Sequence, residues 1–265
     1  MATADDLFLT PCVHVADFTG GYRRVPGRGG GFSYVTARGQ PVRSERTRAR
    51  LDAAGLPPAY TDCWYCASPR GHIQAIGIDA RGRRQYRYHP AFRAEAEDAK
   101  FGRLADFGAA LPAIRRAVDK ALARRDLSRE RVIAAVVRLL DTGCIRIGNR
   151  QYARANRSFG ATTLRRRHAS AGRDTLRLEF TGKSGKAHSI TIGDRRLASL
   201  VRRLKDVPGQ ELFRYRDDAG EWRAVGSADI NGWLRELSGS EFTAKYFRTW
   251  HASVLAFDAL AASKG

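Results

Sequence analysis

The stretch CIRIGNRQYARANRSFGATTLRRRH, residues 144–168, is the part of the chain that says most about its fold and chemistry. It follows an apolar segment, 128–140, in which valine, isoleucine and leucine recur at helical spacing. We expect Gly143 to end that helix, so that Arg146 lies just beyond the end of a rigid helix. A short basic loop in this position is suited to binding a polyanion.

The charge of the whole chain points the same way. The 265 residues include 47 basic and 27 acidic side chains, which gives a net charge of +20 and a pI near 10.7. Nucleic acid is the most plausible partner for so basic a protein, because each neutralised phosphate releases counterions. An unspecialised basic surface remains an alternative, and a membrane surface is disfavoured because no long basic amphipathic helix stands out.

Export and metal binding are both disfavoured by the sequence. No apolar run approaches the roughly 20 residues of a membrane helix, and residues 1–10 lack a basic segment followed by an apolar one. We therefore expect a cytoplasmic protein with reduced cysteines. Cys63 and Cys66 have the spacing of a metal or redox motif, but no second pair completes it. We expect both to be buried on a strand, and we expect no metal and no cofactor.

The first third of the chain has the pattern of a β-rich domain, which we place at residues 1–90. Strands are predicted over 32–42, 60–67, 72–78 and 84–90, with one short helix over 44–54 capped by Ser44. Residues 1–20 are expected to form an irregular arm, and 21–31 a basic, glycine-rich loop. The last strand alternates aromatic with basic or polar residues, which suits either DNA contact or an ordinary edge strand. Its candidate DNA-binding residues are Arg84, Gln85, Tyr86 and Tyr88.

From residue 91 to 265 the pattern becomes mostly helical, so the predicted fold class is α+β. Helices are expected over 94–103, 112–125, 128–140, 194–205, 227–237 and 243–262. Pro112 would occupy the first turn of the second helix. In the last helix Val254, Leu255 and Leu260 are expected to face inward. Two alternating strands, 173–180 and 188–192, predict a β-hairpin with a tip rich in glycine and lysine.

Several motifs resemble one enzyme family. Arg-Ile-Gly-Asn at 146–149, Tyr-Ala at 152–153, Ser-Phe-Gly at 158–160 and Thr-Thr-Leu-Arg at 162–165 are similar to the core of type IB DNA topoisomerases of the bacterial and poxvirus-like branch. Residues 70–90, RGHIQAIGIDARGRRQYRYHP, resemble the end of that family's DNA-clamping N-terminal domain. The resemblance implies a monomeric, nucleoid-associated enzyme that relaxes duplex DNA without ATP through a 3′-phosphotyrosine.

The same resemblance assigns roles to individual cations. It implies that Arg146 and Arg248 hold the scissile phosphate, as the planar fork of arginine suits two oxygens at once. Lys183, which follows Thr-Gly directly and so matches better than Lys186, would protonate the leaving oxygen. Lys245, on the same helix face as Arg248, would be an auxiliary donor. Further DNA contacts are expected from Asn149, Arg165 and His168.

One departure from the family pattern concerns the nucleophile. The family's tyrosine lies downstream of the position of Arg248, but residues 249–265 contain no tyrosine. Tyr246 would lie on a different helix face from Arg248, and we interpret His251 as a packing residue. We expect this chain to lack the nucleophile and to be inactive alone. A non-catalytic DNA-binding remnant is one alternative, and a tyrosine recombinase, which usually has histidine where Lys245 stands, is another.

Overall fold

The computed structural model describes residues 12–27 and 31–263. Most of the arm predicted over 1–20 and residues 28–30 of the loop predicted over 21–31 lie outside these residues. The loop prediction was wrong for residues 22–26, which pair with their neighbours as strand β1. The chain divides into two compact units, Met1–Phe101 and Gly102–Gly265. An antiparallel sheet with a short helix is followed by a helical part with a small sheet, which confirms the predicted α+β class. The division falls inside helix α2, Pro90–Ala123, whereas we expected a boundary at the first residue of that helix.

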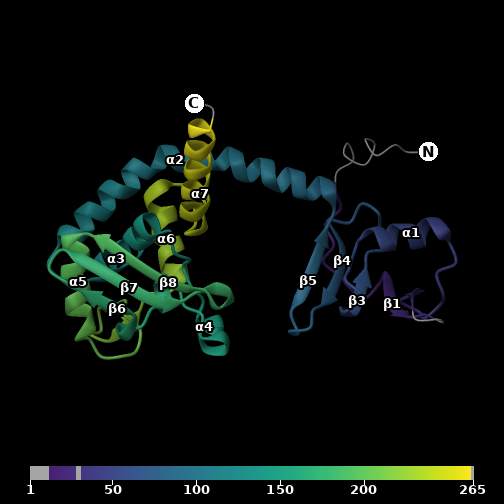
Figure 1. Cartoon of the computed structure of the whole chain (residues 1–265), viewed down its shortest axis with the longest axis horizontal. Coiled ribbons are helices and arrows are strands. Elements are labelled where there is room, and N and C mark those ends of the chain that lie inside the picture. Colours follow the sequence, from purple (N-terminus) through teal and green to yellow (C-terminus); the bar gives the residue numbers. More distant parts are fainter. Residues whose placement is uncertain (1–11, 28–30, 264–265) are drawn as a thin grey trace. The chain divides into compact units, whose positions relative to one another are not determined.

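The first unit is built on one antiparallel sheet, in the order β2-β1-β3-β4-β5 (Figure 1). Helix α1, Glu45–Ala53, begins after Ser44, whose hydroxyl accepts a hydrogen bond from the Thr47 N–H at 3.3 Å, so the predicted cap is confirmed. Leu51 of this helix is buried against the sheet. The strands are β1 Tyr22–Pro26, β2 Phe32–Thr36, β3 Thr61–Tyr65, β4 Ile73–Ile78 and β5 Arg84–Tyr88.

The two cysteines with metal-motif spacing are buried, as predicted, but belong to different clusters. Cys63 packs with Tyr65, and Cys66 packs with Trp64. Alternate residues of a strand face opposite sides of the sheet, which accounts for this separation. Burial raises the pKa of the Cys63 thiol, so this side chain behaves as a small apolar group.

The second unit is organised around helix α3, Arg129–Gly143, which is buried along almost its whole length. It contacts α5, α6, α7, β8 and β9. The predicted hairpin is confirmed as β7 and β8, and β6 extends it to a three-stranded sheet. The elements of this unit are α4 Arg150–Asn156, β6 Ala169–Ala171, β7 Thr175–Thr181, β8 Ala187–Gly193, α5 Arg195–Lys205, β9 Arg214–Arg216, β10 Trp222–Ala224, α6 Ser227–Ser238 and α7 Lys245–Ala262.

Two expectations about helices were wrong. The segments predicted as 94–103 and 112–125 form the single helix α2, with Pro112 in its interior. Proline removes one backbone hydrogen bond there, but Leu111 and Ile114 on either side are fully buried in the core. Burial of this apolar stripe outweighs the local preference for a break.

The last helix is also less buried than predicted. Phe247, the third residue of this helix, is fully buried. Val254, Leu255 and Leu260 are instead 39%, 66% and 64% exposed. Only the first turns of α7 pack on the core, and Figure 1 shows its last turns extending past the other elements of the second unit. Apolar composition alone therefore misassigned these three side chains. None of the helices in the described ranges is both long and apolar enough to cross a bilayer.

Candidate active site

The end of α3 sets the direction of the basic loop. Gly143 is the last helical residue rather than the cap, and Cys144 adopts the left-handed conformation, with φ of 50°. The helix therefore ends at Gly143, as predicted. The turn buries Ile145 and leaves Arg146 exposed at the surface.

Backbone hydrogen bonds from a second segment fix this loop. The Arg146 carbonyl accepts from the Ala161 N–H at 2.8 Å. The Ile147 carbonyl accepts from both the N–H and the hydroxyl of Thr162, at 2.8 and 2.9 Å. Gly160 approaches the loop so closely that an added Cβ would lie 2.5 Å from the Arg146 oxygen. The Ser-Phe-Gly and Thr-Thr motifs therefore form a support segment that fixes the backbone of the loop carrying Arg146.

The same support is joined to the hairpin that carries the lysines. The Phe159 N–H donates to the Thr181 carbonyl at 2.8 Å, at the end of β7. A short 3₁₀ turn, Lys183–Gly185, follows and forms the tip. Gly182 lies directly against the imidazole of His188, so a side chain at this position would clash with it. Lys183 is thus presented from a tightly turned, exposed tip whose base is packed at Gly182.

Helix α7 brings in the third cation. Phe247 anchors the start of this helix in the core through edge-to-face contacts with Phe107. The neighbouring Arg248 guanidinium donates to the Cys144 carbonyl, at the left-handed turn that precedes Arg146. Burial, and then repulsion from Arg146, lower the pKa of Arg248. Two guanidinium groups are therefore held close enough to repel each other, which favours an anion between them.

These segments enclose a cavity of about 370 Å³. Arg146 reaches it from the loop, Lys183 from the hairpin tip and Arg248 from α7, although the sequence separates them widely. Three converging cations match the oxygens of a phosphate. The lining residues are Ile145, Arg146, Phe159, Phe180, Gly182, Lys183, Ser184, Lys186, His188 and Arg248.

Sequence reasoning did not single out His188 as a lining residue and set Lys186 aside. His188 stacks on Phe180, its partner across the hairpin, with ring centroids 5.0 Å apart. The alternation of β8 next to the tip was the available signal, since it places His188 on the same face as Phe180. Lys186 lines the cavity together with Lys183, so both tip lysines can reach an anion.

Other predicted residues lie elsewhere. Lys245 is exposed at the start of α7 and does not line the cavity. Tyr246 packs against the rings of Phe107 and Phe242, at 5.5 and 5.2 Å. His251 Nε2 lies 3.1 Å from Asp141 Oδ1, in agreement with its interpretation as a packing residue.

In the first unit, strand β5 separates the predicted DNA-binding residues onto two faces. Arg84, Tyr86 and Tyr88 are exposed, and the two tyrosine rings stack with centroids 6.1 Å apart. Gln85, on the other face, donates to Asp79 Oδ2 at 2.8 Å. Gln85 is therefore engaged within the unit, and the exposed ladder of Arg84, Tyr86 and Tyr88 is the surface available to a ligand.

In the second unit, the predicted DNA contacts also have local structural partners. Asn149 Oδ1 caps α4 by accepting from the backbone N–H groups of Gln151 and Tyr152, at 2.8 and 3.2 Å. His168 is only 8% exposed, and its Nδ1 accepts from the Arg165 N–H at 3.1 Å. The Arg165 guanidinium lies over the Phe159 ring, 5.4 Å from its centroid.

The buried His168 predicts a pH dependence of stability. Burial, with repulsion from Arg167 and Arg165, lowers the pKa of His168 below its ordinary 6.5. The unfolded chain then binds more protons than the folded chain below about pH 6.5, so the free energy of unfolding falls as the pH drops through this window. The effect is at most about 1.4 kcal/mol per pH unit for one histidine.

Replacing His168→Asn keeps a side-chain acceptor for the Arg165 N–H but removes the titration. We expect the loss of stability between pH 7.5 and 5, measured by urea unfolding, to be smaller in this variant than in the natural chain. Equal slopes in the two proteins would show that His168 titrates normally. His89, whose pKa is also lowered by burial, remains in both proteins and contributes equally.

Comparison with known proteins agrees with this geometry. A family model described as the catalytic core of eukaryotic DNA topoisomerase I matches residues 89–264. A model of the N-terminal domain of bacterial DNA topoisomerase IB matches residues 31–79. This chain belongs to the type IB DNA topoisomerase family, in its bacterial and viral branch.

Three similar proteins illustrate the range of relatives. DNA topoisomerase 1B of Acanthamoeba polyphaga mimivirus is 34% identical over 215 residues, which cover 80% of this chain and 64% of the relative. DNA topoisomerase 1 of Mycosarcoma maydis is 28% identical, over 62% of this chain and 18% of the relative. DNA topoisomerase 1B of vaccinia virus (strain Copenhagen) is 25% identical, over 59% and 49%. The chain thus spans less than two thirds of these relatives.

Proposed function

We propose that this chain provides the DNA-binding surface and the phosphate-binding cations of a type IB topoisomerase that relaxes supercoils without ATP. The convergence of Arg146, Lys183 and Arg248 on one cavity is the observation that supports this proposal. The net charge of +20 supports duplex DNA as the partner. We further propose that the chain acts as a monomer on nucleoid DNA, with the exposed ladder of β5 as part of the binding surface.

The proposed reaction is a transesterification at one phosphodiester. A tyrosine hydroxyl loses its proton to solvent as its oxygen attacks phosphorus, the bond between phosphorus and the 5′ oxygen breaks, and a 3′-phosphotyrosine forms. Arg146 and Arg248 hold the non-bridging oxygens and stabilise the charge that develops on them. Lys183 donates its proton to the departing 5′ oxygen and recovers it when the strand is rejoined. Lys245 is proposed as an auxiliary donor from the same helix as Arg248.

We propose that the nucleophile is not supplied by this chain. Residues 249–265 contain no tyrosine, and Tyr246 is engaged by Phe107 and Phe242 instead of lining the cavity. A cation-lined cavity without its nucleophile can bind the phosphate but cannot form the covalent intermediate. This observation also favours a second candidate function, a non-catalytic clamp on duplex DNA.

The chain alone is expected to bind DNA without cutting it. We expect a fluorescent duplex to be shifted in a native gel, more weakly as salt rises. Supercoiled plasmid incubated with the chain is expected to stay supercoiled, and no protein–DNA band is expected after denaturation. A band that survives denaturant would show that a nucleophile is present, and failure to bind any duplex would overturn the proposed function.

Adding a tyrosine-bearing segment separates the two candidate functions. A C-terminal segment that carries a tyrosine, fused after Gly265, would supply the proposed nucleophile. Plasmid relaxation by the fusion, and its loss when the added tyrosine is changed to phenylalanine, would support the topoisomerase. A fusion that binds DNA but never relaxes it would support the clamp.

A further inference from the structure

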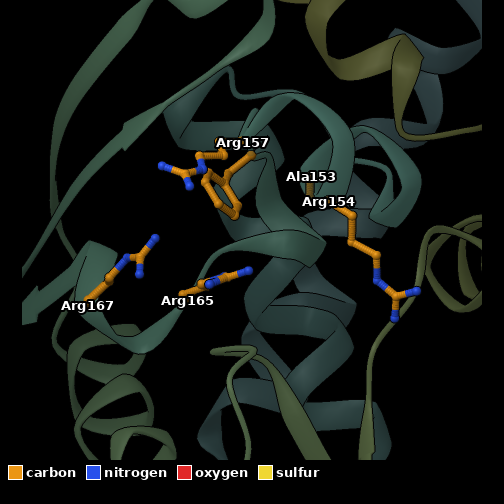
Figure 2. Close-up of a pocket in the computed structure, with 6 residues that line it drawn as sticks. Ala153, Arg154, Arg157, Arg165 and Arg167 are labelled. Atoms are coloured by element: carbon orange, nitrogen blue, oxygen red, sulfur yellow. The ribbon is translucent and has the colours of Figure 1, made fainter.

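A second basic cavity lies beside the candidate active site, and Arg165 is the one lining residue that the sequence predicted to contact DNA. Its volume is about 460 Å³, and it is lined by Ala153, Arg154, Arg157, Phe159, Arg165 and Arg167. Figure 2 shows Arg157 approaching one open space from above and Arg165 and Arg167 from below, while Arg154 extends away from them. Three guanidinium groups thus converge on a space that holds no acidic side chain.

These three arginines lack the partners that normally neutralise such a group. Among the described residues, no carboxylate forms an ion pair with Arg157, Arg165 or Arg167. Glu179 lines the adjoining cavity but is paired with Arg177 at 2.7 Å. Concentrated, unneutralised positive charge is costly for the fold, so it is best explained by an anionic ligand.

The backbone at Arg157 gives a second, independent observation. This residue ends α4 in the left-handed conformation, with φ of 48° and ψ of 32°. Glycine or asparagine normally occupies such a position, because any larger residue is strained there. An arginine at this position costs stability, which suggests that its side chain serves another purpose.

Two neighbouring cavities form a continuous track from this cluster to the candidate active site. The intermediate cavity is lined by Arg157, Arg167 and His168 at one end and by Phe180 and His188 at the other. Phe159 lines all three cavities. Arg166, between Arg165 and Arg167 in sequence, instead donates to the backbone carbonyls at the end of α5. The alternation shows that the two flanking arginines are directed to the track.

We propose that Arg157, Arg165 and Arg167 bind a second backbone phosphate of the same duplex whose scissile phosphate occupies the active-site cavity. This inference rests on the proposed function, since it requires that the chain bind DNA. Three planar guanidinium groups can donate to the oxygens of one phosphate from several sides. The site fixes the position of the duplex relative to Arg146 and Lys183 and does not take part in the chemistry.

The test combines two substitutions with a matched control. Arg157→Gly removes the charge and relieves the left-handed strain, and Arg167→Gln removes the charge of a second exposed arginine. The double variant should bind a short duplex about tenfold more weakly at about 0.1 M salt. The slope of log affinity against log salt should decrease by about 1. Arg116→Gln, an exposed arginine of α2 that lines none of the three cavities, should change neither quantity.

The single variant Arg157→Gly distinguishes a DNA-binding role of Arg157 from a purely structural one. Its melting temperature should rise while its DNA affinity falls, because the two effects arise from the backbone and the side chain separately. An Arg157→Gly variant that loses both stability and affinity would mean that the arginine supports the fold, and the proposed site would be withdrawn.

Neutral phosphate analogues locate the contact on the DNA. Duplexes carrying a single methylphosphonate at successive positions should weaken binding of the natural chain at two places, the scissile phosphate and the proposed second phosphate. In the double variant only the first place should remain sensitive. If the natural chain binds DNA but shows no second sensitive place, the inference is wrong and the proposed function stands. If it binds no duplex at all, the proposed function itself fails.

Discussion

Replacing Gly160→Ala is expected to destabilise the second unit by about 3 kcal/mol, because the new methyl group has no space. Its Cβ would lie 2.5 Å from the Arg146 carbonyl oxygen and 2.6 Å from the Gly148 nitrogen. Both are backbone atoms, which cannot move aside as the end of a side chain can. Gly160 has an extended backbone, so the effect is steric and not a matter of dihedral preference. Urea unfolding followed by circular dichroism measures it.

Gly232→Ala is the matched control for this substitution. Gly232 lies inside α6, and a Cβ there would meet nothing within 4 Å. Alanine is the better helix former, so this variant should gain about 0.5–1 kcal/mol. If Gly160→Ala were as stable as the natural chain, the close contact between the Arg146 loop and its support would not exist. The Gly160→Ala variant should also lose DNA affinity, since the loop that carries Arg146 must shift.

The parts of the fold that sequence predicted well are those determined by neighbouring residues. Ser44 was expected to cap a helix, and its hydroxyl does accept from the Thr47 N–H at 3.3 Å. The helix predicted from residue 194 is likewise capped there, since the Asp194 side chain accepts from the Leu197 N–H at 2.9 Å. Gly239 ends α6 in the left-handed conformation that only glycine adopts easily. The hairpin of β7 and β8 followed from simple alternation. In each case the signal lies within a few residues of its effect.

The parts that sequence missed depend on contacts between distant segments. Pro112 lies inside α2 because the residues around it are buried by other elements. Leu255 and Leu260 were predicted to be buried because they are apolar, but the sequence does not show that α7 extends beyond the core. The three cations of the active-site cavity were identified because the motifs around them resemble those of a known family. Their spacing in the chain gave no indication that they line one cavity. Arg167 was overlooked because one arginine in a basic run resembles any other.

The largest functional effect is expected from Lys183→Ala in the chain extended by a tyrosine-bearing segment. If Lys183 protonates the leaving 5′ oxygen, its removal should slow DNA cleavage by about 10²- to 10⁴-fold. Lys183 is exposed at the hairpin tip, so stability should change little. Single-turnover cleavage of a labelled duplex measures the rate. Lys186→Ala, at the other side of the same tip, is the matched control and should cost less.

The role of Lys183 as the proton donor can be separated from a merely electrostatic one by changing the leaving group. A sulfur in place of the bridging 5′ oxygen leaves as a thiolate, and because a thiol has a pKa near 8.5 it needs no proton at neutral pH. Lys183→Ala should therefore cleave the sulfur substrate almost as fast as the unsubstituted fusion. Arg248→Ala should remain slow on both substrates, because the guanidinium acts on the non-bridging oxygens, which are unchanged. An equal loss on both substrates in the Lys183 variant would remove the lysine from its proposed role and leave Lys186, which lines the same cavity, as the donor to test next.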